Sequence, residues 1–330
     1  MSIDNTLPAA DDSARPARLA HFPVSFFAIV MGLSGLSIAW FRALSAHGSY
    51  PVVAGLIGLL AALVFLTAAG LYLTKLVSHR SHVAAELIHP IKSNFFAAMP
   101  ISLLLLAVVS LPLSPTLSRL IWMIGAAAQL GVLLFVVNAW LHQPRFKVEH
   151  LNPAWFIPAV GNILVPLAGI SHGFVEVSWF FFSIGMLFWI VLLTIVFNRI
   201  LFHAPLPQKL LPTLFILIAP PSIGTIAWVS LNGEFDPLAH GLYGIGLFFT
   251  LLMLTQAARF IRLPFFLSSW AYSFPLTAIA TASFLAHEST GVIGYRWVAY
   301  ALLALASAVI LWLTIRTAMA VANGQICVPE

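Results

Sequence analysis

The sequence predicts an all-α polytopic membrane protein, with ten transmembrane helices arranged as five helical hairpins. Three observations lead to this fold class: the composition, a series of apolar stretches, and the uneven placement of Lys and Arg. Of the 330 residues, 61% are hydrophobic and only 8% are charged, whereas a soluble domain carries about 25% charged residues. A soluble chain of this length could not bury so much apolar surface, so the composition excludes that class.

Ten stretches match the roughly 20 apolar residues that are needed to cross a bilayer. They cover residues 22–43, 51–76, 94–113, 117–141, 153–171, 177–200, 210–231, 238–260, 264–286 and 297–321. Most connections between them are short, so successive spans should be antiparallel neighbours. We therefore expect a disordered cytoplasmic N-terminal tail (1–20), a ten-helix membrane domain (21–321) and a short cytoplasmic C-terminal tail (322–330).

The basic residues orient these spans. If both termini lie on one side of the membrane, that side receives twelve of the 15 Lys and Arg residues. The other side receives only Arg42, Arg119 and Arg296. Cytoplasmic segments carry an excess of Lys and Arg, so both termini are expected in the cytoplasm. The net charge of +5 then reflects topology, and no nucleic-acid partner is expected.

Proline distinguishes the odd-numbered spans from the even-numbered ones. The odd spans contain or adjoin Pro23, Pro100, Pro158, Pro166, Pro220, Pro221 and Pro275, while the even spans have none beyond Pro51 at a first residue. Proline bends a helix and is tolerated where neighbours or water satisfy the freed backbone groups. Each hairpin should supply one kinked inner helix and one smooth outer helix, and five inner helices can enclose a central pore. The alternative is that these residues only allow close helix packing.

The middle of each span lacks Asp, Glu, Lys and Arg. Ion-coupled carriers and cation channels usually depend on such residues. A lining of backbone dipoles, hydroxyls and apolar side chains instead suits anions that enter a positive potential. The candidate pore-lining residues are Ser25, Ser102, Asn162, Thr225, Ser273 and Thr277. No catalytic residue, bound metal or cofactor is expected.

The ninth span contains the stretch "SSWAYSFPLTAIATA", residues 268–282. Trp270, Phe274, Thr277 and Thr281 recur at helical spacing and should share one face. If that face meets the pore, the Phe274 ring would plug it, and the kink at Pro275 would set the ring's position. An apolar plug of this kind gates by dewetting or by a rotamer change. The alternative is a phenylalanine packed between helices.

Five segments together resemble the tellurite-resistance/dicarboxylate transporter family, which includes the plant slow-type guard-cell anion channels. They read "HFPVSFFAIVMGLSGLSIAW", "ELIHPIKSNFFAAMP", "NPAWFIPAVGNILVP", "LFILIAPPSIGTIAW" and "WAYSFPLTAIATA". The resemblance implies a homotrimer in which each subunit has five inner and five outer helices around its own pore. It also implies transport of chloride, nitrate, malate or sulfite. In the channel branch a phenylalanine of the ninth helix occludes the pore, and the matching residues here are Tyr272, Ser273, Phe274 and Pro275. The short tails favour a bacterial member in the inner membrane.

The expected function is a passive channel for small anions, with small inorganic or organic anions and membrane lipid as partners. A carrier or exporter of C4-dicarboxylates such as malate, or of sulfite, is the first alternative. Arginines near the span ends could attract anions into a vestibule or simply reach the membrane surface: Arg42, Arg119, Arg262 and Arg296. A membrane metalloenzyme is the second alternative, based on the H-x-x-H pair His79 and His82 and the cytoplasmic His89, His142, His150 and His203.

Overall fold

The computed structural model describes residues 18–45 and 51–327, and within these ranges the chain is helical with no β-strand. Most of the expected N-terminal tail and the last three residues of the expected C-terminal tail lie outside the described residues. The three tail residues that are described at the N-terminal end, 18–20, are helical. The fold class predicted from the sequence, an all-α membrane protein, is confirmed.

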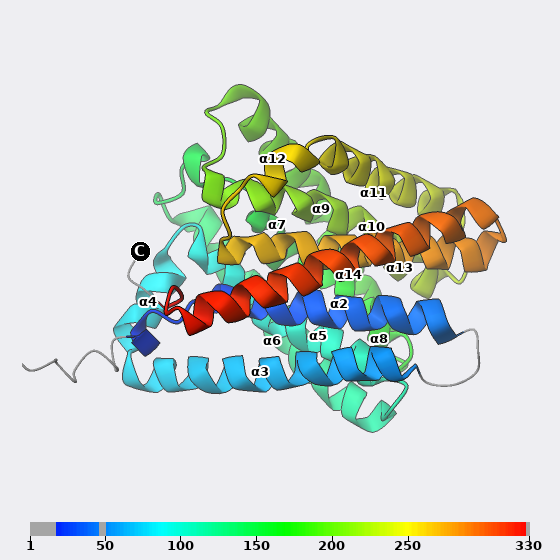
Figure 1. Cartoon of the computed structure of the whole chain (residues 1–330), viewed down its shortest axis with the longest axis horizontal. Helices are drawn as coiled ribbons and strands as arrows, with labels where there is room; N and C mark the ends of the chain where they lie inside the picture. Colours follow the sequence, from blue (N-terminus) through cyan, green and yellow to red (C-terminus); the bar gives the residue numbers. More distant parts are fainter. Residues whose placement is uncertain (1–17, 46–50, 328–330) are drawn as a thin grey trace, which may run out of the picture.

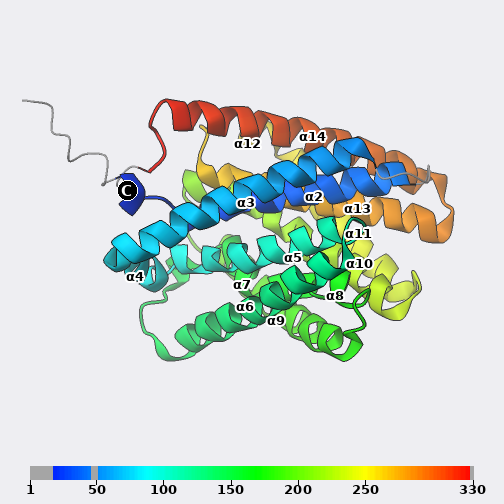
Figure 2. The same ribbon diagram turned by 90° about the horizontal axis from the view of Figure 1, so that it is seen from below.

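The helices form hairpins that each pair an inner helix with an outer one (Figure 1). The inner helices are α2 (Phe27–Leu44), α5 (Ala98–Ser110), α7 (Phe156–Val160) with α8 (Pro166–Gly169), α10 (Ala219–Asn232) and α13 (Ser273–Thr290). The outer helices are α3 (Val52–Ser78), α6 (Pro115–His142), α9 (Val175–Phe202), α11 (Pro237–Thr255) and α14 (Ile293–Ala322). Two short helices, α4 (Arg80–Ile88) and α12 (Ala257–Ile261), follow outer helices. Figure 2 shows α14 along one side of the bundle and α6 and α9 along the other.

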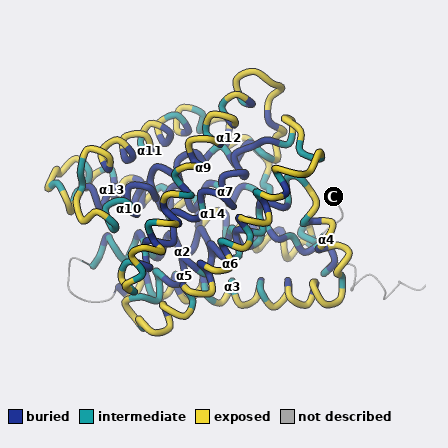
Figure 3. The backbone as a smooth tube through the Cα atoms, turned by 180° about the vertical axis from the view of Figure 1, so that it is seen from behind, coloured by how far each residue is buried: buried dark blue, intermediate teal, exposed yellow. Residues whose placement is uncertain are grey.

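Burial separates the two sets, as the distribution of prolines predicted. The spans built around α2, α5 and α10 are 61–67% buried, whereas α3, α6, α9, α11 and α14 are 22–39% buried. Every residue of α13 from Ser273 to Ala286 is buried. The outer helices expose apolar side chains such as Leu56, Leu187 and Leu251, and Figure 3 shows this exposed shell around a buried centre. Such a surface suits lipid rather than water.

The prolines lie in the first turn of the inner α-helices rather than in their middles. Pro100, Pro158 and Pro275 are third residues of α5, α7 and α13, and Pro220 and Pro221 follow the first residue of α10. The first N–H groups of a helix have no partner within it, so proline costs no hydrogen bond there. A 3₁₀ segment precedes each of these helices. Proline therefore marks the point at which a 3₁₀ segment becomes an α-helix.

The expected count of ten spans is not confirmed. Among the described residues, eight helices are long and apolar enough to cross a membrane. The fifth expected span is the shorter and interrupted segment Pro153–Gly169. The ninth, α13, is helical but contains several hydroxyl side chains and ends near His287 and Glu288, which lowers its hydropathy. Both segments are nevertheless buried inside the bundle.

Both described ends of the chain lie at the same end of the bundle, where Arg18 lies against Gly324 (Figure 1). A buried ion pair secures this end: Lys75 Nζ lies 2.8 Å from Glu86 Oε1 and donates to the carbonyl oxygen of Phe22 at 2.8 Å. The Tyr72 hydroxyl donates to the other Glu86 oxygen at 2.7 Å. These bonds connect α3, α4 and the segment that leads into α2.

Candidate functional site

A narrow cavity lies at the centre of the bundle, and all five inner segments contribute to its wall. Met31, Ile101, Val160, Ile223 and Phe274 come from α2, α5, α7, α10 and α13 respectively. The cavity has a volume of about 80 Å³ that water-sized molecules can occupy. On the same scale, a cavity of roughly 10–15 Å³ can hold one water molecule. The space can therefore contain only a few waters or a small ion with part of its hydration shell.

The wall of this central cavity is almost entirely apolar. Among the described residues that line it, Ser25 and Ser268 carry the hydroxyl groups, and none is charged. The indole of Trp270 also lines it, but its Nε1 donates to Thr317 Oγ1 at 2.9 Å. Apolar walls hold water weakly, so a constriction of this kind resists ions until it widens or becomes wet.

Phe274 and Pro275 both lie in this wall, at the point where α13 begins. The Phe274 side chain is 9% exposed. Its ring packs against Gly35 of α2, where an added Cβ would lie 3.2 Å from Phe274 Cδ2. The next turn of α13 is also close, because the same Cβ would lie 2.3 Å from Thr277 Oγ1. A glycine in α2 thus creates the space in which the ring sits.

Of the six polar residues that sequence patterns suggested for the lining, the structure places Ser25 in the cavity wall. The other five are buried outside it, and each donates to a backbone carbonyl three or four residues earlier in the chain. The acceptors are Ala98 for Ser102, Ala159 for Asn162, Pro221 for Thr225, Trp270 for Ser273 and Phe274 for Thr277. Hydroxyls in helices commonly bond to the carbonyl three or four residues earlier. The four hydroxyls are thus satisfied close to their own position in the chain, whereas the Oδ1 of Asn162 is buried and has no hydrogen-bond partner among the described residues.

Most of the cavity residues that sequence reasoning missed are apolar, such as Met31, Ile101, Val160 and Ile223, and Ser268 is a missed hydroxyl. In a chain that is 61% hydrophobic, an apolar side chain that faces a cavity has no contrast with one that faces a helix or lipid. The only available signal is distance along the helix from a proline. Ile101 follows Pro100 directly, and Ile223 lies two residues after Pro221.

The arginines near span ends have different surroundings. Arg42 forms an ion pair with Glu288, whereas Arg119 lies over the Phe174 ring and Arg296 over the Tyr300 ring, with centroid distances of 5.2 and 5.8 Å. Arg262 is exposed just beyond α12.

Of the histidines that suggested a metal site, His79 and His82 lie at the start of α4. The His79 and His82 rings are 5.9 Å apart, and His82 lies 5.6 Å from His21. Within residues 18–45 and 51–327, no three His, Cys, Asp or Glu side chains form a group that could hold a metal ion. The central cavity is the candidate site because it is enclosed by elements from the whole chain.

Comparison with known proteins matches residues 21–318 to a family described as SLAC1, voltage-dependent anion channel. The S-type anion channel SLAH3 of Arabidopsis thaliana is 32% identical over 273 residues, which cover 80% of this chain and 43% of that protein. SLAH2 of the same plant is 29% identical, with 83% of this chain and 54% of the relative covered. The chain therefore spans about half the length of these plant relatives. A tellurite resistance protein TehA homolog of Haemophilus influenzae is 26% identical, with 79% and 80% covered.

Proposed function

The chain belongs to the SLAC1 family of voltage-dependent anion channels, and from this membership we propose that it is a passive channel for small anions such as chloride and nitrate. The family consists of membrane anion channels and transporters, so anion transport is its class of activity. Localisation in a bacterial inner membrane, with both termini cytoplasmic, is part of the proposal. It is supported by the distribution of Lys and Arg and by the position of both described chain ends at one end of the bundle.

One observation carries the proposal: a central apolar cavity is walled by all five inner segments of the chain. A solute that crosses through this space meets no buried acid or base in the described lining. Nothing there would bind a proton or cation tightly. Small anions shed hydration more readily to weak donors and apolar walls when the local potential is positive. The positive net charge of +5 favours that potential.

We assign the gate to Phe274 and its positioning to Pro275. The ring lies in the first turn of α13 and lines the central cavity, whose volume is only about 80 Å³. Pro275 is the third residue of α13, shortly after the 3₁₀ segment Leu267–Tyr272, and it restricts the backbone next to the ring. Rotation of the ring would widen an apolar constriction and let water enter it.

A carrier or exporter of malate or sulfite is the second candidate, and Arg42 is the observation that favours it. Its guanidinium reaches across the outer end of the bundle to Glu288, and a guanidinium can bind a carboxylate or sulfite through two hydrogen bonds. Saturable flux with strong preference for one such anion would support the carrier. Currents carried by several unrelated anions would support the channel.

We also propose a homotrimer in lipid. The exposed apolar faces of the outer helices, with Leu56, Leu187 and Leu251 each more than 60% exposed, require a cover of lipid or neighbouring subunits. Mass measurement of the purified protein in detergent tests this state directly.

The function is tested by anion current in oocytes or planar bilayers for the wild type, for Phe274→Ala and for a control, Phe248→Ala. Phe248 is 59% exposed on α11, away from the cavity. We expect Phe274→Ala to raise chloride and nitrate current at least about tenfold, since lowering a barrier by about 1.4 kcal/mol gives that factor. Phe248→Ala should behave as wild type. If Phe274→Ala is folded but carries no more current than the wild type, Phe274 is a packing residue and not a gate. Flux assays with malate and sulfite would then be the next test.

A further inference from the structure

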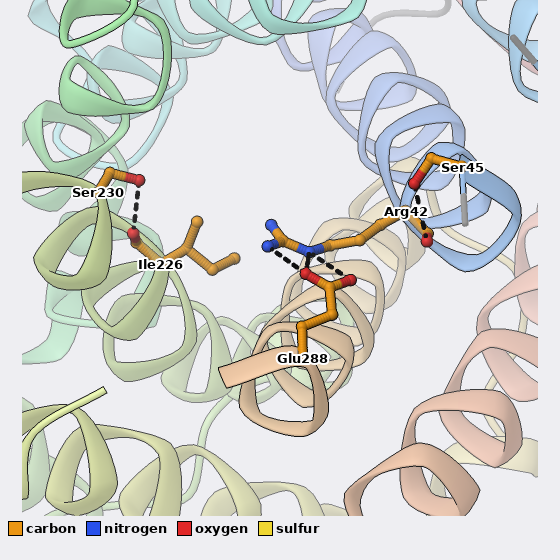
Figure 4. A network of polar contacts seen from close by, with 5 residues as sticks. All are labelled: Arg42, Ser45, Ile226, Ser230 and Glu288. Carbon is orange, nitrogen blue, oxygen red and sulfur yellow. Dashed lines mark hydrogen bonds and ion pairs between the residues drawn. The ribbon is translucent and has the colours of Figure 1, made fainter. Parts of the chain in front are cut away.

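An ion pair between two inner helices lies at the end of the bundle opposite the chain termini. Arg42 stands near the end of α2, and Glu288 near the end of α13. The shortest contact, between Arg42 Nη2 and Glu288 Oε2, is 2.7 Å. Arg42 Nε donates to the same oxygen at 3.0 Å. Figure 4 shows the two side chains meeting in the space that faces Ile226 and Ser230 of α10.

Both members of this pair lie on the helix faces that line the central cavity. Arg42 follows Met31 by about three helical turns, and Glu288 follows Phe274 by about four turns at 3.6 residues per turn. Residues at whole-turn separations share a face. The pair is therefore displaced along the proposed path by roughly 20 Å from the Phe274 ring, at 1.5 Å per residue.

The space around the pair is much wider than the central cavity. It offers about 590 Å³ by the same measure. Ile38, Val108 and Pro112 of the inner hairpins line it together with Arg42 and Glu288. It has the form of a vestibule: a broad chamber with one cation and one anion on its wall.

The geometry of the pair leaves part of the guanidinium available. Glu288 accepts from Nε and Nη2, while Nη1 has no hydrogen-bond partner among the described residues. The Arg42 side chain is 28% exposed and that of Glu288 is 45% exposed. Nη1 is thus the guanidinium nitrogen that a dissolved anion would contact.

We propose that Arg42 is an anion-binding residue of an outer vestibule, and that Glu288 weakens this site by occupying the other side of the guanidinium. The proposal rests on the proposed anion conduit and adds a recruitment site to it. An arginine at a pore mouth concentrates anions, and a neighbouring carboxylate lowers that attraction so that a bound anion can leave. The ligand class is a small monovalent anion such as chloride or nitrate.

A purely structural role for the pair is the competing explanation. Ion pairs that are this exposed contribute little to stability. The contact between α2 and α13 is already close without it, because Gly32 and Gly35 bring α2 against Ser273 and Thr277. The two charges therefore affect the electrostatic potential in the vestibule more than they affect the stability of the fold.

The test measures chloride current against chloride concentration in the Phe274→Ala background for Arg42→Gln, Glu288→Gln and the double variant. One unit charge at about 6 Å in water changes the local anion concentration about threefold. Glu288→Gln should therefore lower the half-saturating chloride concentration about threefold, and Arg42→Gln should raise it by a similar factor. The double variant has the same net charge as the parent, and its half-saturating chloride concentration should lie between those of the two single variants. Shifts in the same direction for both single variants, or none, would overturn the proposal.

A second measurement does not depend on conduction. A ligand that binds the folded protein stabilises it by an amount that rises with the ratio of ligand concentration to dissociation constant, so the unfolding temperature of purified protein is followed as chloride replaces gluconate. Chloride should stabilise Glu288→Gln more than the parent and Arg42→Gln less. If Phe274→Ala carries no current but this order holds, the conduit fails and the binding site stands. If current flows and chloride stabilises all variants equally, the binding site fails and the conduit stands.

Discussion

A methyl group at Gly35 is the perturbation that most directly tests how the Phe274 ring is held. Gly35 lies in α2 where this helix meets α13. An added Cβ would lie 2.3 Å from Thr277 Oγ1 and 3.2 Å from both Thr277 Cβ and Phe274 Cδ2. The first of these separations is too short for two atoms that are not bonded. Alanine at this position must therefore displace α13, the Thr277 side chain or the ring.

The expected cost of Gly35→Ala is about 1–3 kcal/mol in the free energy of unfolding, the range found for overpacked cores. Most of it should come from Thr277, because its hydroxyl makes the shortest contact and would also lose its 2.8 Å bond to the carbonyl of Phe274. Thr277→Ala removes that hydroxyl and should recover at least half of the cost. Phe274→Ala relieves a contact of 3.2 Å only, and it should recover less.

The assay is unfolding in detergent for Gly35→Ala alone and in the Thr277→Ala and Phe274→Ala backgrounds. Gly131→Ala is the matched control, because no atom lies within 4 Å of a Cβ added there in α6. Alanine favours a helix over glycine by up to about 1 kcal/mol, so this control should be neutral or slightly stabilised. A Gly35→Ala protein as stable as wild type, or a cost unchanged by Thr277→Ala, would refute the close packing on which the proposed gate depends.

Two further predictions concern the two ends of the bundle. Lys75→Met should lower the free energy of unfolding by about 3–5 kcal/mol, because it leaves the carboxylate of Glu86 partly buried without its cation. In the same detergent assay, the double variant Lys75→Met with Glu86→Gln should recover part of this loss. At the other end, backbone donation from Ala239 and the indole N–H of Trp228 hold the pKa of Asp236 below its ordinary value of 3.8. The contribution of the ionised Asp236 side chain to folding stability is complete above that value, and it is lost as pH falls through the lowered pKa. Unfolding temperatures recorded from about pH 6 to about pH 2 should depend less on pH in Asp236→Asn than in the wild type. The same pH dependence in both proteins would contradict the lowered pKa of Asp236.

The inner and outer helices could be predicted because the positions of proline and the burial of a helix both depend on how its backbone hydrogen-bonding groups are satisfied. A helix that faces lipid must satisfy its own backbone, and the outer helices of this chain contain proline only as a first residue, in α6 and α11, whereas a buried helix can begin after a 3₁₀ segment. The sequence does not reveal that the kinks are first-turn junctions, since the end of a 3₁₀ segment carries no residue signature in an apolar run. The fifth span was expected at 153–171, but its interruption within Pro153–Gly169 was not predicted for the same reason.

A polar residue in an inner helix does not by itself indicate that its side chain lines the cavity. A hydroxyl in an apolar helix suggests a wet environment, but a carbonyl three or four residues earlier is always within reach and satisfies it. Ser102, Thr225 and Ser273 take this route. The ion pair of Arg42 and Glu288 joins residues 246 positions apart, and only the folded chain brings them together. Spacing within one helix singles out Phe274 beside Pro275, and both lie in the wall of the central cavity, while the role of Phe274 as a gate stays a prediction.

The proposed channel separates attraction of an anion from control of its passage. Attraction belongs to Arg42 in a vestibule of about 590 Å³, and closure belongs to Phe274 in a cavity of about 80 Å³. A charge placed roughly 20 Å away along the helix is screened by salt, with a Debye length of about 8 Å at physiological ionic strength. Changes at Arg42 should therefore leave the barrier at the ring nearly unaltered. Under the two proposals, Phe274→Ala raises the maximal current, whereas Arg42→Gln moves the concentration at which current saturates. If both variants changed the same parameter, one constriction would have to perform both tasks.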